Sequence, residues 1–123
     1  MRKIILSIFT ILSFFISTNI NSQNNSTIQS LIDSANDGEQ LIIPAGTYEE
    51  SLIIDKSINL EADGEVVLNV SGYQTGILIL TGVANVTING FTITGDTSTG
   101  SGITISPDTE NITIESNTIQ NIF

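Results

Sequence analysis

One pattern of apolar and polar residues occurs twice in this chain. It consists of Gly-Ile-x-Ile, a spacer of five residues, Asn-[Val/Ile]-Thr-Ile, a spacer of three residues, and Thr-Ile. The pattern begins at Gly76 and again 26 residues later at Gly102. A fixed period of this length is typical of a repeat architecture. Within each unit apolar residues alternate with polar ones, as Val86 and Ile88 do around Thr87, and a period of two predicts strands. We therefore expect an all-β fold in which each unit is one coil of a parallel solenoid.

The register of the two units predicts which side chains lie on top of each other. Segment 57–60 corresponds to 85–88 at a spacing of 28, so the first full coil is expected to be two residues longer. Asn85 and Asn111 should fall at the same corner. The residues expected to point inward and to stack in pairs are Ile77 on Ile103, Ile79 on Ile105, Val86 on Ile112, Ile88 on Ile114 and Ile93 on Ile119.

A short amphipathic helix is predicted ahead of the first strand. Ser26 and Gln29 have the spacing of a capping box, and Asp37-Gly38 provides a stop signal with a glycine free to adopt a left-handed conformation. One apolar stripe follows from the helical spacing of Ile28, Leu31, Ile32 and Ala35. Such a helix would cover the open end of the apolar column and block edge pairing of the first strands.

The N-terminus has the pattern of an export signal. A basic start, Met1-Arg2-Lys3, precedes an apolar stretch over 4–16 that is too short to span a bilayer, and polar residues follow at once. We expect residues 1–22 to be a signal peptide cut after Ser22, and residues 23–123 to form one β-helix domain. The protein is then secreted, periplasmic or at the cell surface, without a stable membrane span.

Composition excludes several classes of function. The chain of 123 residues has no cysteine and no histidine, and its formal net charge is −10. Disulfides and thiolate metal sites are therefore excluded. Beyond residue 22 Lys56 is the only base against 13 acids. Such a charge repels nucleic acid and anionic lipid, so no nucleic-acid partner is expected, whereas a neutral polysaccharide or cell-surface glycan is compatible with it.

The segment from Thr27 to Leu60 resembles the N-terminal region of a known superfamily. Its Thr-Ile-Gln start, its Leu-Ile-Ile-Pro-Ala-Gly-Thr-Tyr run over 41–48 and its Lys-Ser-Ile-x-Leu segment at 56–60 are similar to motifs of the right-handed parallel β-helix, or pectin-lyase-like, superfamily. Segment 85–95 resembles the repeat of NosD-like and surface proteins. The resemblance covers 27–123 and implies a right-handed parallel β-helix. It leaves the function open, because this fold carries lyases, hydrolases, esterases, epimerases, adhesins and structural modules.

Most of the basic residues that enzymes of the superfamily would need are missing beyond residue 22. The resemblance implies a basic residue with calcium-binding acids in a lyase, aspartates with an arginine in an esterase, and aspartates with a histidine in a hydrolase; beyond residue 22 only Lys56 is basic. We therefore expect an exported non-catalytic module for surface adhesion, structure or polysaccharide contact. The alternative is the N-terminal part of a polysaccharide lyase, glycoside hydrolase or epimerase whose catalytic coils are missing. No His, Met or Cys cluster supports a NosD-like accessory role.

A few side chains are candidates for ligand contact. Glu61, Asp63 and Glu65 alternate on an extended segment and form a candidate calcium site, although a solvated acidic turn explains them as well. Tyr48 and Tyr73 could stack on sugar rings or pack in turns.

Stacking of the coils also predicts an outward column of Glu61, Asn89 and Glu115, which is a polar glycan track or a solvated face. Residues 121–123 lie part-way through a coil with no polar cap after them. We therefore expect either an incomplete domain or self-association through the open C-terminal coil.

Overall fold

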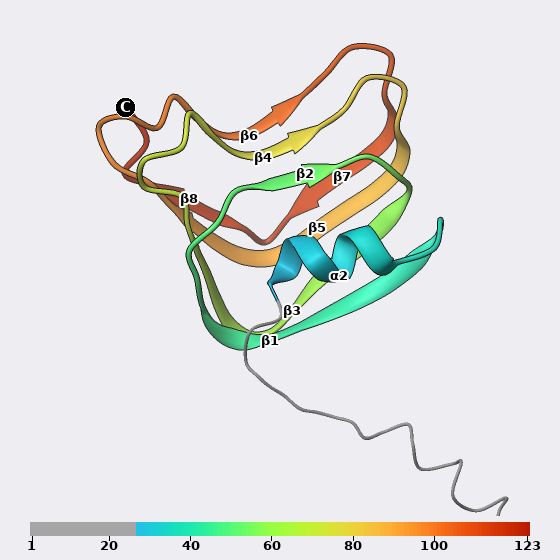
Figure 1. Cartoon of the computed structure of the whole chain (residues 1–123), viewed down its shortest axis with the longest axis horizontal. Coiled ribbons are helices and arrows are strands. Elements are labelled where there is room, and N and C mark those ends of the chain that lie inside the picture. The colour runs from blue at the N-terminus through green and yellow to red at the C-terminus, as the bar shows by residue number, and fades with distance from the viewer. Residues whose placement is uncertain (1–26) are drawn as a thin grey trace, which may run out of the picture.

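A computed structural model describes residues 27–123. This described part is mostly β-strand (57%), with one short helix and parallel sheets, which confirms the expected all-β class. The predicted signal peptide over 1–22 lies outside the described residues. The elements in chain order are α2 (Ile28–Ser34), β1 (Glu39–Tyr48), β2 (Leu52–Ile54), β3 (Ile58–Asn69), β4 (Thr75–Ile79), β5 (Ala84–Thr94), β6 (Ser101–Ile105), β7 (Glu110–Glu115) and β8 (Thr118–Gln120) (Figure 1).

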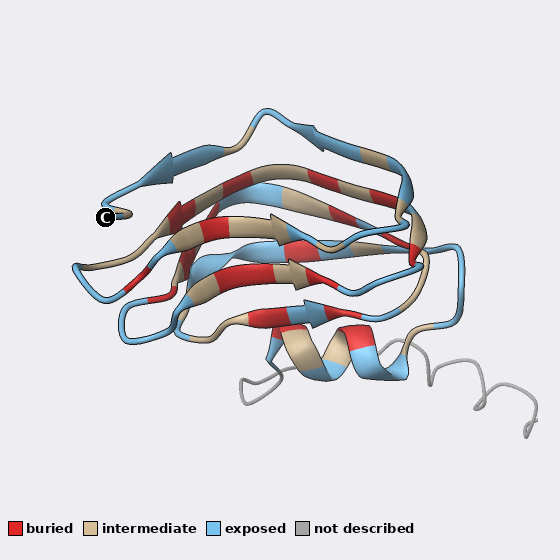
Figure 2. Ribbon diagram, turned by 90° about the horizontal axis from the view of Figure 1, so that it is seen from above, coloured by how far each residue is buried: buried red, intermediate tan, exposed pale blue. Residues whose placement is uncertain are grey.

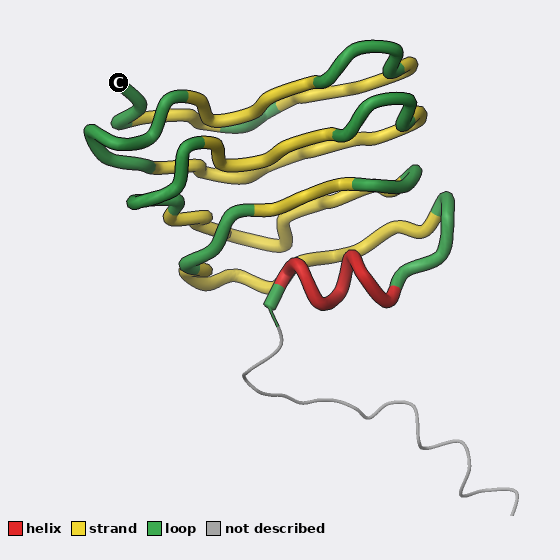
Figure 3. Tube along the Cα trace, turned by 45° about the horizontal axis from the view of Figure 1, so that its top comes forward, coloured by secondary structure: helices red, strands yellow, loops and turns green. Residues whose placement is uncertain are grey.

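The strands form two parallel sheets, and the chain alternates between them (Figure 3). The larger sheet has the order β1-β3-β5-β7, with β8 also pairing with β5, and the smaller has the order β2-β4-β6. Every pairing is parallel. Parallel neighbours need a crossover connection, and here each crossover includes a strand of the other sheet.

The pairing register follows the sequence repeat. Ile77 pairs with Ile103, and Thr92 pairs with Thr118, both at the predicted spacing of 26. Ile58 pairs with Val86, which confirms the longer spacing of 28 upstream. Because a slip of one residue would turn every apolar side chain outward, the alternating pattern fixes this register.

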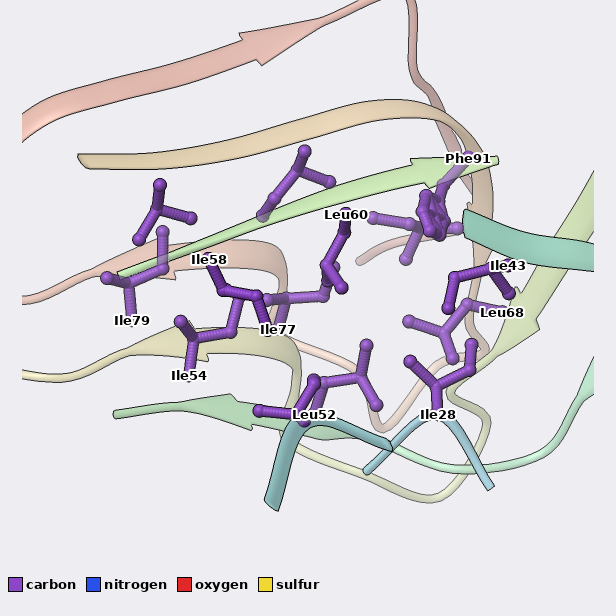
Figure 4. Packing of buried hydrophobic residues seen from close by; sticks show 14 of the residues in the cluster. Ile28, Ile43, Leu52, Ile54, Ile58, Leu60, Leu68, Ile77, Ile79 and Phe91 are labelled. Atoms are coloured by element: carbon purple, nitrogen blue, oxygen red, sulfur yellow. The ribbon is translucent and has the colours of Figure 1, made fainter. Parts of the chain in front are cut away.

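One apolar core lies between the two sheets (Figure 4). The predicted inward residues of the first unit are fully buried, and most other core side chains are β-branched or leucine, which pack well on a pleated surface. Only Ile103 and Ile112 of the second unit pack partly against this core. The fully buried side chains of β4 and β5 are these five predicted residues, Ile77, Ile79, Val86, Ile88 and Ile93, together with Phe91.

The helix α2 packs on the first layer of strands, as the apolar stripe predicts (Figure 2). Ile28 and Ile32 are fully buried, and Leu31 lies partly buried against the core. The capping box differs from the prediction, because Thr27 rather than Ser26 is the N-cap. The Ser30 N–H donates to Thr27 Oγ1 at 3.0 Å, and the Thr27 N–H donates to Ser30 Oγ at 3.2 Å, so a serine in the first turn takes the role expected of Gln29.

Helix α2 ends earlier than the stop signal at Asp37-Gly38 indicates. The last helical residue is Ser34, and the Ala35 N–H donates to the Ile32 carbonyl oxygen at 3.1 Å with Ala35 already extended. Gly38 has the expected left-handed backbone, with φ of +86°. It therefore shapes the turn into β1 rather than the last helical turn.

The Gly/Ser/Thr turn between β5 and β6 is tied to the core, although its composition suggests a flexible segment. Thr99 is fully buried and its hydroxyl donates to the Val70 carbonyl oxygen at 3.1 Å. Asp96 holds the turn from the outside, since its Oδ1 accepts from the Ser98 N–H at 2.9 Å and from the Ser98 hydroxyl at 2.6 Å. A small buried threonine therefore anchors this turn by a bond that sequence spacing does not reveal.

Candidate binding face

Polar side chains stack in two neighbouring columns on the outer side of the larger sheet. In the first column Asn59 pairs with Thr87, and Thr87 pairs with Thr113. In the second column Glu61 pairs with Asn89, and Asn89 pairs with Glu115, which confirms the register predicted for it. We call these six residues the polar face: Asn59, Glu61, Thr87, Asn89, Thr113 and Glu115.

The polar face points away from the core because successive side chains of a strand alternate between the two sides of a sheet. Ile58 and Leu60, which flank Asn59, are fully buried, whereas Asn59 itself is exposed. Neighbouring strands lie about 4.8 Å apart, so the columns present amide, hydroxyl and carboxylate groups at that interval. The Gln40 side-chain amide donates to Glu61 Oε1 at 2.7 Å and extends the polar surface onto β1.

The three carboxylates predicted as a calcium site are not brought together as a ligand cluster. No group of three or more Asp, Glu, His or Cys side chains that could hold a metal ion occurs within residues 27–123. Glu61 belongs to the polar face, while Asp63 and Glu65 are exposed beyond it. Gly64 between them has φ of +95°, and the pairing register with β5 shifts between Glu61 and Val66. This shift interrupts the strict alternation on which the predicted site depends, and calcium binding stays a prediction from the sequence.

Lys56, the one base available for proton abstraction, is engaged at the end of α2. Its ammonium group donates three hydrogen bonds, to the carbonyl oxygens of Ile32 at 2.9 Å, Asp33 at 3.2 Å and Ala35 at 3.1 Å. The last carbonyls of a helix have no intrahelical partner and carry partial negative charge, so a cation there is favourable. All three donors of the ammonium group are used. Lys56 is therefore a structural residue in this arrangement.

Glu50 serves the opposite end of the same helix. Its Oε2 accepts from the Ile28 N–H at 2.7 Å, and its Oε1 accepts from the Gln29 N–H at 3.4 Å. A carboxylate at a helix N-terminus satisfies free donors and complements the helix dipole. Glu50 and Lys56 lie on either side of β2 in the sequence, so this strand and its flanks hold both ends of α2.

Gln29 closes the edge of β2. Its Oε1 accepts from the Ile53 N–H at 2.8 Å, and its Nε2 donates to the Ile53 carbonyl oxygen at 3.1 Å. The amide side chain thus replaces the backbone of a further strand. We call Gln29, Glu50 and Lys56 the helix clamp. All three belong to the segments that carry the superfamily resemblance, but the sequence alone does not show that they meet at α2.

The two tyrosines differ in their surroundings. The Tyr48 hydroxyl donates to the Pro44 carbonyl oxygen at 2.8 Å, and its ring packs partly against the core. Burial and the nearby Glu50 carboxylate raise the pKa of the Tyr48 phenol above its usual value. Turn packing therefore accounts for Tyr48, whereas Tyr73 is 43% exposed and free to touch a ligand.

Asparagines at the corners bond to the chain itself. Asn111 Nδ2 donates to Asn85 Oδ1 at 2.9 Å, and both residues have a left-handed backbone, with φ of 55° and 60°. Asn117 Oδ1 accepts from the Phe91 N–H and Asn117 Nδ2 donates to the Ile88 carbonyl oxygen, both at 2.8 Å. Asn85 and Asn111 are therefore stacked as predicted but bond each other through their side chains, whereas Asn117 satisfies two backbone groups.

Comparison of the chain with protein-family models, with curated proteins and with solved structures found no match. None of the helices within 27–123 is long and apolar enough to cross a membrane.

Proposed function

We propose that residues 27–123 form a right-handed parallel β-helix, and that this β-helix is an exported, non-catalytic module that binds neutral polysaccharide along the polar face. Two parallel sheets whose strands pair at the repeat spacing support the fold. Crossovers between parallel strands of one sheet are right-handed in about 98% of cases, which supports the hand. The export signal predicted from the sequence over 1–22 supports the location.

The polar face is the observation that carries the proposed function. Its amide, hydroxyl and carboxylate groups both donate and accept hydrogen bonds, as is needed to pair with the hydroxyls of a sugar chain. They repeat along the stack at about 4.8 Å, so an extended polymer could make similar contacts on successive strands. Glu61 and Glu115 add negative charge, and an uncharged polysaccharide avoids repulsion from them.

The surroundings of Lys56 support the non-catalytic part of the proposal. Proton abstraction from a sugar needs a base within hydrogen-bond reach of the substrate. The Lys56 ammonium group already donates to three carbonyl oxygens at the end of α2, so none of its N–H donors is left to face a substrate. Arginine and histidine, which superfamily esterases and hydrolases use beside their aspartates, do not occur beyond residue 22.

Binding of the purified protein to neutral and acidic polysaccharides, with and without calcium, tests the proposal. Affinity electrophoresis on neutral glucans and xylans should show retardation that needs no calcium. The Asn89→Ala variant, at the centre of the polar face, should bind at least tenfold more weakly, a loss of about 1.4 kcal/mol. Thr92→Val removes a polar group from β5 beyond the bend and is the matched control, with unchanged binding.

Three results would contradict the proposal. Equal losses for Asn89→Ala and Thr92→Val would mean that the polar face does not make the contact. Release of new reducing ends or of unsaturated sugars would show turnover, which favours the N-terminal part of a carbohydrate-active enzyme instead. Binding to acidic polysaccharide only when calcium is present, and its loss in Glu65→Gln, would move the contact to the predicted calcium residues.

A further inference from the structure

The outer side of the smaller sheet carries a strip of apolar side chains. Ile53 of β2 pairs with Leu78 of β4, and both point away from the core, since the residues on either side of each are fully buried. The Leu80 N–H donates to the Ile54 carbonyl oxygen at 3.0 Å, which continues the same register. Ile53 is 47% exposed and Leu80 is 36% exposed. We call Ile53, Leu78 and Leu80 the outer strip.

Three hydroxyl groups lie against one margin of the outer strip. Thr104 of β6 pairs with Leu78, and its Oγ1 lies 2.7 Å from both Thr75 Oγ1 and Ser101 Oγ. Thr75 Oγ1 and Ser101 Oγ are also bonded to each other, at 2.5 Å. We call Thr75, Ser101 and Thr104 the hydroxyl triad.

The hydroxyl triad can accept hydrogen bonds from a ligand but has none to donate. Each hydroxyl carries one proton and two lone pairs. Its three protons serve the three bonds within the triad, so each oxygen donates once, accepts once and keeps one lone pair. The complementary group therefore donates several hydrogen bonds, as the ammonium group of lysine and the guanidinium group of arginine do.

Carboxylates lie along the β2 side of the outer strip. The Gln29 amide nitrogen donates to the Ile53 carbonyl oxygen at 3.1 Å and to Asp33 Oδ1 at 2.9 Å, which holds Asp33 beside β2. Asp55 comes two residues after Ile53 and is exposed. Beyond residue 22 the chain has 13 acids against one base, Lys56. Both the local and the overall charge therefore attract a cationic partner and repel an anionic one.

We propose that the outer strip is the docking surface for a basic amphipathic helix of a partner protein. Apolar side chains of that helix cover the strip, and a lysine or arginine at one margin donates to the hydroxyl triad. Basic side chains at the other margin pair with Asp33 and Asp55. The partner lies on the face of the sheet and adds no strand at β2, because Gln29 closes that edge.

The charge of this chain argues against a second copy as the occupant. Beyond residue 22 its one base is Lys56, whose ammonium group already donates to three carbonyl oxygens. A second copy therefore has no free cation to place against the hydroxyl triad. The polar face lies on the larger sheet, so docking at the outer strip is independent of the proposed polysaccharide binding.

Calorimetric titration of the purified protein with a synthetic helical peptide tests the inference. The peptide consists of leucine and lysine, with the leucines on one face and the lysines along both margins of that face. We expect saturable binding of one peptide per chain. A peptide of lysine alone, and an analogue with glutamate in place of lysine, should each bind at least tenfold more weakly, about 1.4 kcal/mol.

Two exposed isoleucines provide a matched pair of variants. Ile53→Ser removes an apolar side chain from the outer strip and should weaken peptide binding about tenfold, since a buried aliphatic side chain contributes about 1.5–3 kcal/mol. Ile42→Ser makes the same change at an isoleucine of β1 that is 51% exposed, on the other sheet, and should leave binding unchanged.

Two further pairs separate the hydroxyl triad and the carboxylates from general effects of polarity and charge. Thr104→Val removes one acceptor without changing shape and should weaken binding about fivefold, whereas Thr92→Val on the larger sheet should not. Asp55→Asn should weaken binding about threefold at low salt, whereas Asp63→Asn makes the same change in charge away from the strip and should not. Circular dichroism of every variant verifies the strand content.

Several outcomes would overturn the inference. Failure of the leucine–lysine peptide to bind would do so, and so would equal losses in Ile53→Ser and Ile42→Ser, because both would mean that the outer strip makes no contact. Self-association of the protein that excludes the peptide would assign the surface to a second copy. Displacement of the peptide by a neutral glucan would assign it to polysaccharide.

Discussion

Replacing Lys56 by methionine isolates the contribution of the helix clamp. Methionine keeps an unbranched side chain of similar length but removes the ammonium group. The carbonyl oxygens of Ile32, Asp33 and Ala35 then lose this donor, and the Ile32 oxygen keeps its bond from the Ala35 N–H. The exposed Asp33 carbonyl can turn to water, whereas the bonds to Ile32 and Ala35 are part-buried and water replaces them less well.

The size of the effect follows from the part-buried Ala35 carbonyl, which loses its Lys56 donor, and from the helix dipole. An unsatisfied buried acceptor costs about 1–3 kcal/mol, and loss of a cation at a helix C-terminus costs about 0.3–1 kcal/mol. Partial access of water reduces the first figure, so we expect the free energy of unfolding to fall by about 2 kcal/mol. For a domain of this size that is a decrease in Tm of about 8–16 °C.

Thermal unfolding and native-state amide exchange together measure this effect. Lys56→Met should lower Tm, and the Ile53 amide, which Gln29 protects, should exchange faster because α2 detaches more often. The control Thr97→Asp makes the same change in net charge at an exposed turn position. If the Tm of Lys56→Met equals that of Thr97→Asp and Ile53 keeps its protection, the ammonium group does not hold α2, and the clamp argument fails.

Three further perturbations probe the repeat. Gly76→Ala would place a Cβ 2.5 Å from the Gly102 carbonyl oxygen on the next strand and should lower the free energy of unfolding, measured with urea, by about 1–3 kcal/mol. In the control Gly100→Ala the nearest atom to the new Cβ lies at 3.5 Å, so the change should be nearly neutral. Asn85→Ala should lower the free energy of unfolding by about 1–2 kcal/mol because alanine is strained in the left-handed backbone of this position, and it also removes the side-chain bond to Asn111. Asn85→Gly should lower the stability less, because glycine adopts this backbone freely, and equal losses would refute the backbone argument. Hydrogen bonds from the Ser98 hydroxyl and N–H hold the pKa of Asp96 below its ordinary value of 3.8. The stabilisation from these hydrogen bonds is present above pH 3.8 and is lost as the pH falls through the lower pKa of Asp96 in the folded state, so amide exchange at Thr99 should become faster over that range. An NMR titration of Asp96 with an ordinary pKa would contradict the assignment.

The strand pairing could be predicted from the sequence because the information is local and periodic. The alternation at Val86-Thr87-Ile88 predicts which side chains face the core. The same pattern at 112–114 predicts which strand pairs with β5. The same reasoning places Asn89 between two carboxylates on the outer face. No knowledge of distant contacts is needed for any of these conclusions.

The parts of the structure that the sequence does not reveal depend on contacts between distant segments. Lys56 acts at carbonyls more than 20 residues earlier in the chain, so its spacing carries no signature of a helix cap. Thr99 is buried and bonds to Val70, 29 residues earlier in the chain, against the usual preference of threonine for the surface. At 61–65 the local pattern misleads, because Gly64 adopts a left-handed conformation that interrupts the alternation expected of a strand.

The in-register pairing at 26 residues makes the length of this molecule adjustable in fixed steps. A further unit of the same period, inserted between Gly95 and Asp96, would add one layer of about 4.8 Å and leave every strand with its apolar face toward the core. A single residue inserted within β5 would instead turn the rest of that strand inside out. The width of the molecule is therefore set by the two sheets, and its length by the number of whole repeats.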